Sequence, residues 1–394
     1  MDKNKKIWKT INKAFIIGFL LMIVLPVAFF NMETGAVSEN EKRLFANLPS
    51  VHATDGSFNE NVRAEFSDWL GDRIGFRQSL VRTASHIKLS VLHESPSSII
   101  HVGQNGWYYY AEQGNILIAK GQYDLTEPML QRIAANQQAI SDYYKQNDVD
   151  YYLMITPAKT SIYPEFVGVG SYTLRETPVD VVERYLAENT DVQMINPKMT
   201  LIENKDKGQL FLKQDFHWTN LGAYYAYRAT IEHWNRTGLL HDVPIEVHVE
   251  DIDYGTGEVS GYFGGADFLN AEIAPSVRWR ENAVQLEDGI YFKEIEAICA
   301  GAESGELIAS LAVYENPKVP SGRLLIYGDS QIMPERKLPR CLSEHFSIVV
   351  NTGIRPEFNP ELEAFVQPDV VIYSCSERNI NASLHGIDFL SKIQ

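Results

Sequence analysis

Two short motifs contain residue types that can perform nucleophilic catalysis. In DFHW, Asp215 and His217 lie one residue apart, and the run LLIYGDS ends in Ser330. A serine hydroxyl becomes an effective nucleophile when a neighbouring base takes its proton and an acid orients that base. We therefore predict a triad in which Ser330 is the nucleophile, His217 is the general base and Asp215 holds the imidazole in the correct tautomer.

The spacing of Asp215 and His217 fits this prediction, because residues i and i+2 of an extended segment point to the same side. Two other interpretations of the motif stay open. Asp215 can cap the helix that follows while His217 packs beside it, or both side chains can bind a metal ion. Metal binding is the weaker alternative because no nearby carboxylate–histidine cluster supplies further ligands. We therefore expect neither a metal nor another cofactor.

The elements around these motifs follow a β/α pattern. Near-continuous apolar runs predict buried strands, and the periodic stretches between them predict helices. This pattern indicates an α/β fold with a mostly parallel sheet covered on both faces, and ligands of such sheets bind outside the carboxyl ends of the strands. Ser330 is thus expected at a strand end. The predicted strands are 150–158, 192–197, 322–330, 346–353 and 369–377, and the predicted helices are 126–146, 178–189 and 220–234.

The amino-terminal region predicts a membrane anchor. Residues 1–13 hold five lysines and one aspartate, and residues 14–32 contain no charged side chain. A run of this length crosses a bilayer core of about 30 Å, and the basic flank predicts a cytoplasmic amino terminus. We expect an uncleaved transmembrane signal anchor, with everything after it outside the cytoplasm. A cleaved signal peptide is the alternative.

The rest of the chain divides by composition. Residues 33–60 are polar and predict a juxtamembrane linker, and residues 61–394 predict the folded domain. A helical stretch with a break near Gly71 and Gly75 begins that domain, and Asn105-Gly106 predicts a hairpin turn. At about 240–320 the regular pattern stops, which indicates an irregular insertion.

Charge and cysteine content exclude other classes of protein. The formal net charge is −16, and the lysine-rich tail leaves the remainder still more acidic. We expect no nucleic-acid partner, because that binding depends on cations that meet phosphates. Cys299, Cys341 and Cys375 form no C-x-x-C pair, so buried free thiols are expected.

Six segments, in order, resemble the SGNH-hydrolase-like proteins of the alginate O-acetyltransferase group (AlgJ/AlgX type), which include the bacterial DHHW proteins. The sequence departs from the family pattern at Phe216, where DHHW proteins have His, and at Gln331, where an aromatic residue is common. As in that family, the D-x-H motif precedes the serine, which implies the triad Ser330, His217 and Asp215. The six segments are SENEKRLF, DWLGDRIGFRQSL, VGQNGWYYY, TPAKTSIYPE, DFHWTNLGAYYAY and IYGDSQI.

The resemblance implies an SGNH-hydrolase-like three-layer α/β/α fold that transfers O-acyl groups, most commonly acetyl, to an exported or cell-surface polysaccharide. It also implies an acyl donor and an MBOAT-type membrane acyl carrier as partners. Two alternatives remain: a carbohydrate or lipid esterase of SGNH type, and a noncatalytic polysaccharide-binding subunit of an export complex. Weaker candidates for substrate or oxyanion binding, each with a purely structural alternative, are Gln331, Arg378, Asn379, Arg355, Lys159, Trp218 and Tyr163.

Overall fold

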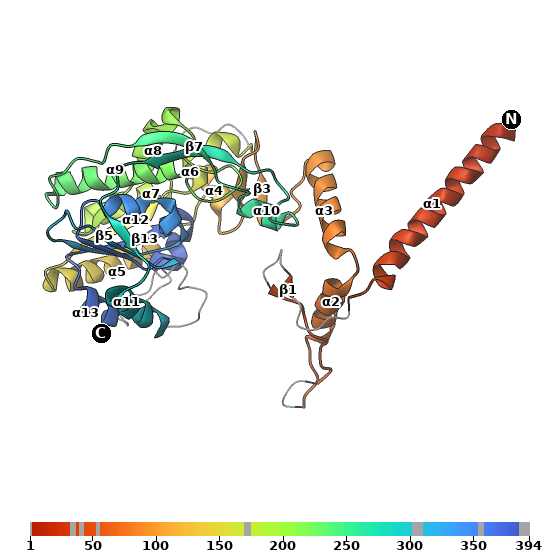
Figure 1. Ribbon diagram of the computed structural model, residues 1–394, viewed down its shortest axis with the longest axis horizontal. Coiled ribbons are helices and arrows are strands. Elements are labelled where there is room, and N and C mark those ends of the chain that lie inside the picture. The colour runs from red at the N-terminus through yellow and green to blue at the C-terminus, as the bar shows by residue number, and fades with distance from the viewer. Residues whose placement is uncertain are drawn as a thin grey trace. The chain divides into compact units, whose positions relative to one another are not determined.

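The computed structural model describes residues 2–31, 37–38, 43–52, 56–168, 175–301, 310–353 and 358–385. The chain forms two compact units, shown with their elements in Figure 1. The first unit is Met1–Ser97 with Glu258–Asn270, and the second is Ser98–Gly257 with Ala271–Gln394. The α/β unit therefore begins at Ser98 and not at residue 61, because the first helices after the apolar run belong to the other unit.

The first unit is mainly helical. Its helix α1 contains the segment Ile7–Ala28, which is long and apolar enough to cross a membrane or to act as a signal sequence, and which is not buried. The helix α1 starts before residue 14 and ends at Ala28, four residues before the end of the expected span at 14–32. The elements of the unit are α1 (Asp2–Ala28), β1 (Val37–Ser38), β2 (Arg43–Leu44), α2 (Val62–Arg73), α3 (Arg77–Ile87), a π-helical turn (Lys88–Leu92) and α10 (Glu258–Tyr262).

The break between α2 and α3 lies at Gly75, as the sequence predicts, whereas Gly71 stays inside α2. A Cβ at Gly75 would lie 2.5 Å from the carbonyl oxygen of Phe29, so only glycine permits the close approach of the end of α1. The ring of Phe29 packs on the ring of Phe76 with centroids 5.0 Å apart. The end of α1 is thus attached to the α2–α3 corner.

The second unit is built on a seven-stranded sheet with the order β6-β5-β13-β11-β12-β10-β9. The strands β6, β5, β13, β11 and β12 are parallel, and β10 and β9 continue the sheet in antiparallel pairing. The sheet strands are β5 (Asp150–Thr156), β6 (Gln193–Ile195), β9 (Val284–Leu286), β10 (Ala312–Glu315), β11 (Arg323–Tyr327), β12 (Ile348–Asn351) and β13 (Val370–Ser376).

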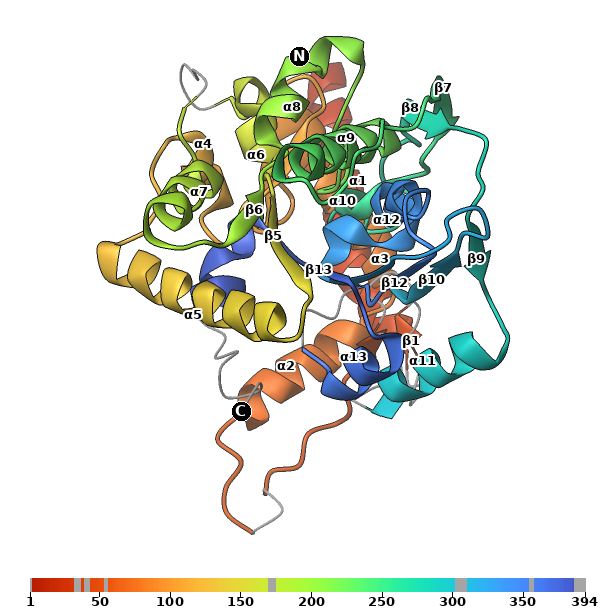
Figure 2. The ribbon, with the colours of Figure 1, turned by 90° about the vertical axis from the view of Figure 1, so that its left-hand side faces the viewer.

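Helices cover both faces of this sheet (Figure 2), which confirms the expected three-layer α/β/α arrangement. One face carries α5 (Glu127–Gln146), α7 (Pro178–Asn189), α11 (Ile290–Gly301) and α13 (Pro360–Val366). The other carries α8 (Lys198–Glu203), α9 (Asn220–Thr237) and α12 (Leu338–Leu342). The helices predicted at 126–146, 178–189 and 220–234 correspond to α5, α7 and α9, and α9 extends three residues beyond its predicted end.

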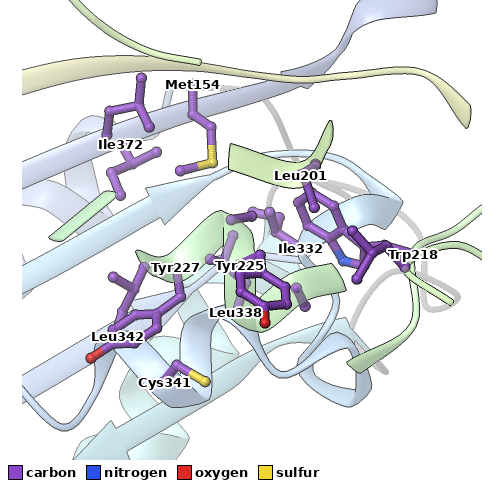
Figure 3. Packing of buried hydrophobic residues seen from close by; sticks show 14 of the residues in the cluster. Met154, Leu201, Trp218, Tyr225, Tyr227, Ile332, Leu338, Cys341, Leu342 and Ile372 are labelled. Carbon is purple, nitrogen blue, oxygen red and sulfur yellow. The ribbon is translucent and has the colours of Figure 1, made fainter. Parts of the chain in front are cut away.

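Side chains of the central strands alternate between two hydrophobic clusters. In β5, Leu153 and Ile155 face the α5 side, whereas Tyr152 and Met154 face the α9 side. Figure 3 shows the packing on the α9 side, where Met154 and residues of β13, α9 and α12 meet. The two buried faces explain why the strands are apolar at nearly every position.

The segment at 240–320 is more regular than expected. It contains β9, α11 and β10, and also the antiparallel pair β7 (His248–Asp253) and β8 (Ile273–Arg278). β9 lies at the edge of the sheet, β7 and β8 form a two-stranded sheet, and β10 has four residues, so these strands lack the long apolar run that identifies a central strand.

A β-hairpin precedes the sheet, as Asn105-Gly106 predicts. β3 (Ile100–Val102) pairs antiparallel with β4 (Tyr108–Tyr110), and Asn105 and Gly106 have φ of 55° and 77°. Two successive positive φ values are typical of a tight hairpin turn. The remaining helices are the short α4 (Asn115–Ala119) and α6 (Lys159–Ile162).

Candidate active site

Ser330 lies just after β11, at the carboxyl edge of the parallel strands. Glycine is required two residues before it, because a Cβ at Gly328 would lie 2.2 Å from Cδ1 of the buried Ile332. Gly328 therefore lets Ile332 pack closely against the end of β11, and the Ser330 side chain is half-buried.

Asp329 stabilises this turn. One carboxylate oxygen accepts the N–H of Gln331 at 3.0 Å and caps the short 3-10 helix that begins at Ser330. The other accepts the N–H of Ser376 at 2.6 Å, at the end of β13. One side chain thus connects the carboxyl ends of two neighbouring strands.

Asp215 and His217 lie in a tight excursion of the chain between Phe211 and Trp218, which form an isolated β-bridge. The segment bends at each residue and is not extended, which corrects the local geometry that we expected. The two side chains meet because Asp215 Oδ1 accepts the backbone N–H of His217 at 3.0 Å, in an Asx-turn. The helix α9 is capped by Thr219, whose Oγ1 accepts the N–H of Gly222, so Asp215 is not its cap.

The three predicted side chains form one hydrogen-bonded chain. Nδ1 of His217 lies 2.6 Å from Oδ1 of Asp215, and Nε2 of His217 lies 2.8 Å from Oγ of Ser330. Asp215 and His217 are 6% and 2% exposed. The buried carboxylate fixes the tautomer that carries its proton on Nδ1, so Nε2 is free to accept a proton from the hydroxyl.

Arg336 is a neighbour of the triad that the sequence analysis did not identify. Its Nη2 lies 3.2 Å from Nδ1 of His217 and 4.0 Å from Oδ1 of Asp215. Burial alone would raise the pKa of Asp215, but the hydrogen bonds from His217 and the guanidinium charge lower that pKa well below its ordinary range. The acid therefore stays ionised throughout the neutral range.

Glu272 also supports the turn that carries Asp215, and the sequence analysis did not identify it. Its carboxylate accepts the backbone N–H groups of Lys213 at 2.7 Å and Gln214 at 3.0 Å, and the side-chain amide of Gln209 at 2.6 Å. These bonds fix the backbone that leads into Asp215. No short-range pattern signals this role, because Glu272 is more than 50 residues away along the chain.

The weaker candidates take different positions. Gln331 is buried and donates from Nε2 to the carbonyl oxygen of Phe216 at 3.2 Å. Arg378 lies over the ring of Tyr110, with 4.8 Å between its guanidinium carbon and the ring centroid. Asn379 follows it in a 3-10 turn after β13. Arg355 lies outside the described residues.

Three candidates do not present free groups to a sugar, which corrects the expectation for them. Trp218 is fully buried in the core on the α9 side (Figure 3). The hydroxyl of Tyr163 accepts the N–H of Leu210 at 3.0 Å in the same cluster. The ammonium of Lys159 is enclosed and donates to three backbone carbonyls.

Two hollows border the triad. A cavity of about 340 Å³ lies beside Asp215 and Arg336, and its other walls include Asn220, Tyr254 and Glu335. A second, narrow pocket is lined by Gln331, Arg378, Tyr110, Phe216 and further residues near the strand ends. The larger hollow, beside Asp215, has the size that small ligands use.

A three-layer α/β/α unit with a Ser–His–Asp chain at its carboxyl edge has the architecture of an SGNH-hydrolase-like protein. Residues 100–260 match the family described as "SGNH hydrolase-like domain, acetyltransferase AlgX". This segment contains Asp215 and His217 and ends before Ser330. This match supports the SGNH-hydrolase-like AlgJ/AlgX family for this part of the chain.

Curated relatives agree with this family. The probable alginate O-acetylase AlgJ of Pseudomonas putida is 29% identical over 124 residues, which are 30% of this chain and 31% of the relative. AlgJ of Pseudomonas aeruginosa is 25% identical over 172 residues, 41% of this chain and 39% of the relative. The aligned part spans about a third of the length of these relatives.

Solved structures with a similar fold include the O-acetyltransferase domain of Pseudomonas putida AlgJ. It has a TM-score of 0.48 and 19% identity, and the alignment covers 75% of this chain and 98% of that one. Bacillus cereus PatB1 with a sulfonyl adduct has a TM-score of 0.46 and 14% identity, with 66% and 92% covered. A DHHW family protein from Eubacterium siraeum has a TM-score of 0.46 and 13% identity, with 66% and 88% covered.

Proposed function

We propose that this protein is an O-acyltransferase that moves an acyl group, in the first place acetyl, from a donor to a polysaccharide through an acyl-enzyme on Ser330. The observation that carries the proposal is the continuous chain from Asp215 through His217 to Ser330, with contacts of 2.6 and 2.8 Å. The names of the relatives AlgJ and AlgX support acetyl as the group and a polysaccharide as the acceptor.

The reaction has two steps that are chemically equivalent. In the first, Oγ of Ser330 attacks the acyl carbonyl carbon while Nε2 of His217 takes the serine proton. His217 then gives this proton to the departing donor group. In the second, a sugar hydroxyl attacks the same carbon, His217 takes its proton, and Oγ of Ser330 leaves and recovers that proton. The first step breaks the bond between the acyl carbon and the donor group and forms the Ser330 ester. The second step breaks that ester and forms the sugar ester, and Asp215 stabilises the imidazolium each time.

The proposed location is the outer side of the membrane. The apolar helix α1 and the lysines before it support an anchor whose amino terminus is cytoplasmic. An acyl donor inside the cell would then require a membrane protein to pass the acyl group across, and we propose an MBOAT-type carrier for that role. A reporter fused after Gln394 is expected to be active only outside the cytoplasm; activity only in the cytoplasm would refute this topology.

The test of the activity uses the full chain in detergent micelles with an activated acetyl ester. Intact-protein mass spectrometry is expected to detect one acetyl group on the wild type and none on Ser330→Ala. Acetylated sugar should form when an oligosaccharide acceptor is added. Acetate release with no acetylated sugar from any acceptor would favour the esterase alternative, and absence of an acyl-enzyme would favour a binding subunit.

A further inference from the structure

Lys159 has a surrounding that is unusual for a lysine. The residue is 4% exposed, and it follows β5 at the start of α6. Its ammonium donates to the carbonyl oxygens of Tyr108 at 2.7 Å, Lys213 at 2.9 Å and Asp215 at 3.0 Å. The three N–H groups of the ammonium are therefore all used, and two of the acceptors belong to the turn that carries the triad acid.

Aromatic rings complete the enclosure. Nζ of Lys159 lies 5.0 Å from the ring centroid of Trp107 and 5.1 Å from that of Tyr109. Both distances are within the range of cation–π attraction, which is stronger where the cation is desolvated. The hairpin β3–β4 thus supplies rings and one carbonyl, and the turn before α9 supplies two carbonyls.

Ionisable groups reach Lys159 from every element packed around it. Negative charges come from Asp215 and Glu272, which favour the charged ammonium. Glu377, in the turn after β13, accepts the N–H of Ala158 at 2.8 Å. The remaining groups are the phenols of Tyr108, Tyr109 and Tyr110 in β4, and Arg378, which lines the same narrow pocket as Lys159.

We propose that the Lys159 ammonium is a positioning group for the reaction: it holds the backbone of Asp215 in the turn that places His217 against Ser330. The inference rests on the proposed triad function. Lys159 touches neither substrate nor the reacting atoms, and it acts through the carbonyl of Asp215. A neutral amine has two N–H groups and one lone pair, so it cannot serve three carbonyls, and one of them would face the lone pair.

This difference between the two protonation states makes the role measurable. Burial lowers the pKa of Lys159 to about 7, while Glu272 and Asp215 act against that shift. Below this value the ammonium predominates and the turn is held. As the pH rises through it, the amine predominates and one contact is lost, so turnover should fall on the alkaline side of neutrality.

The experiment measures the second-order rate of Ser330 modification by a sulfonyl fluoride from pH 5 to pH 9 with the full chain. The wild type is expected to show an alkaline decline near neutral pH. Lys159→Met, which keeps the length and removes the charge, should react about 10- to 100-fold more slowly at pH 6 and should lack that decline, because misplacing a reacting group by about 1 Å costs about this much.

Lys198 provides a matched control. It is 2% exposed, its ammonium donates to Arg175 O and Thr177 Oγ1, each at 3.0 Å, and it pairs with Asp180. None of these three partners belongs to the triad or to the turn that carries Asp215. Lys159→Met and Lys198→Met should both lower the melting temperature, because each removes a buried ammonium. Lys198→Met should nevertheless keep the alkaline decline and the wild-type rate of Ser330 modification at pH 6. A purely structural role of Lys159 would make the two variants behave alike.

The outcomes separate the inference from the proposed function. No modification of the wild type at any pH, or equal modification of Ser330→Ala, would reject the triad itself. Modification with the same alkaline decline in Lys159→Met would reject the role of Lys159 alone.

If Lys159→Met does not fold, Trp107→Phe replaces it. The smaller ring binds the ammonium less strongly, so the decline should move to lower pH by about half a unit. An unmoved decline would overturn the proposal.

Discussion

The side-chain amide of Gln331 donates a hydrogen bond to the backbone carbonyl of Phe216 at 3.2 Å. These are the two positions where the sequence departs from the family pattern, and they are in direct contact. The bond connects the loop that carries the proposed nucleophile, Ser330, to the turn that carries the proposed acid and base.

Gln331→Leu should reduce turnover by about fivefold to tenfold, because it removes this connection and keeps the side-chain volume. The expected loss corresponds to about 1 kcal/mol, the usual net contribution of one hydrogen bond. The measurement is kcat with an acetyl ester, beside a thermal melt.

Gln137→Leu is the control for this variant. Gln137 is fully buried, accepts one hydrogen bond from Tyr151 at 2.7 Å and lies on the α5 side of the sheet. It should lose stability to a similar extent with kcat unchanged. Equal kcat losses in both variants would show that Gln331 serves packing and not the alignment of the two loops.

Arg336→Met should lower kcat about tenfold with little change in melting temperature. The guanidinium lies near Asp215 Oδ1 and helps to keep that carboxyl ionised and in place. Arg336→Lys should recover part of the loss, because lysine keeps the positive charge but lacks the planar guanidinium group. Arg340→Met is the control, since Arg340, in α12, pairs with the partly exposed Glu281. A rise in the KM for the acceptor with kcat unchanged would instead assign Arg336 to the adjacent cavity.

Much of the site could be predicted because its chemistry is encoded in short motifs at predictable places. An apolar run that ends in Gly-Asp-Ser identifies a strand end, and parallel strand ends share one edge, so Ser330 had a definite location. The meeting of Asp215 and His217 was predicted for the wrong local reason: an Asx-turn and not an extended segment brings them together.

The supporting groups could not be predicted from local patterns. Glu272 and Lys159 reach the same turn from segments more than 50 residues away on either side, and each contacts backbone atoms that any residue would supply. The antiparallel strands β9 and β10 were missed for a related reason. Their pairing depends on a neighbour in space, and three or four residues carry too little apolar signal.

Glu363 should make stability fall as the pH rises from about 4.5 to 7. Burial raises the pKa of Glu363 to about 7, although the hydroxyls of Tyr144 and Tyr327 bond to its carboxylate and oppose that shift. The folded state therefore binds the proton more tightly than the unfolded state, so stability is highest below the unfolded pKa and is lost as pH rises through the folded one.

Urea unfolding at pH 5 and pH 8 measures this effect. Glu363→Gln, which stays neutral, should lose about 2 kcal/mol less than the wild type over this interval. Its kcat should be unchanged, because the residue lies on the α5 side of the sheet. A wild type and a variant with parallel pH dependence would show that Glu363 ionises freely in the folded protein.

The triad should behave as one unit and not as three additive parts. Ser330→Ala removes the nucleophile and His217→Ala removes its base, so each abolishes the same covalent step. Each should lower acetyl-ester turnover by several orders of magnitude, and the double variant should be little worse than either. Asp215→Asn should cost less, yet heavily, because the amide favours the wrong imidazole tautomer.

Thermal melting of the same variants separates chemistry from packing. Ser330 is half-buried, so Ser330→Ala should melt like the wild type. His217 is buried and bonded at both ring nitrogens, so His217→Ala should melt a few degrees lower while turnover falls a thousandfold or more. If turnover in His217→Ala fell only in proportion to the folded fraction, His217 would be a packing residue. Near-full turnover in Ser330→Ala would require a different nucleophile, since no acyl-enzyme can then form at residue 330.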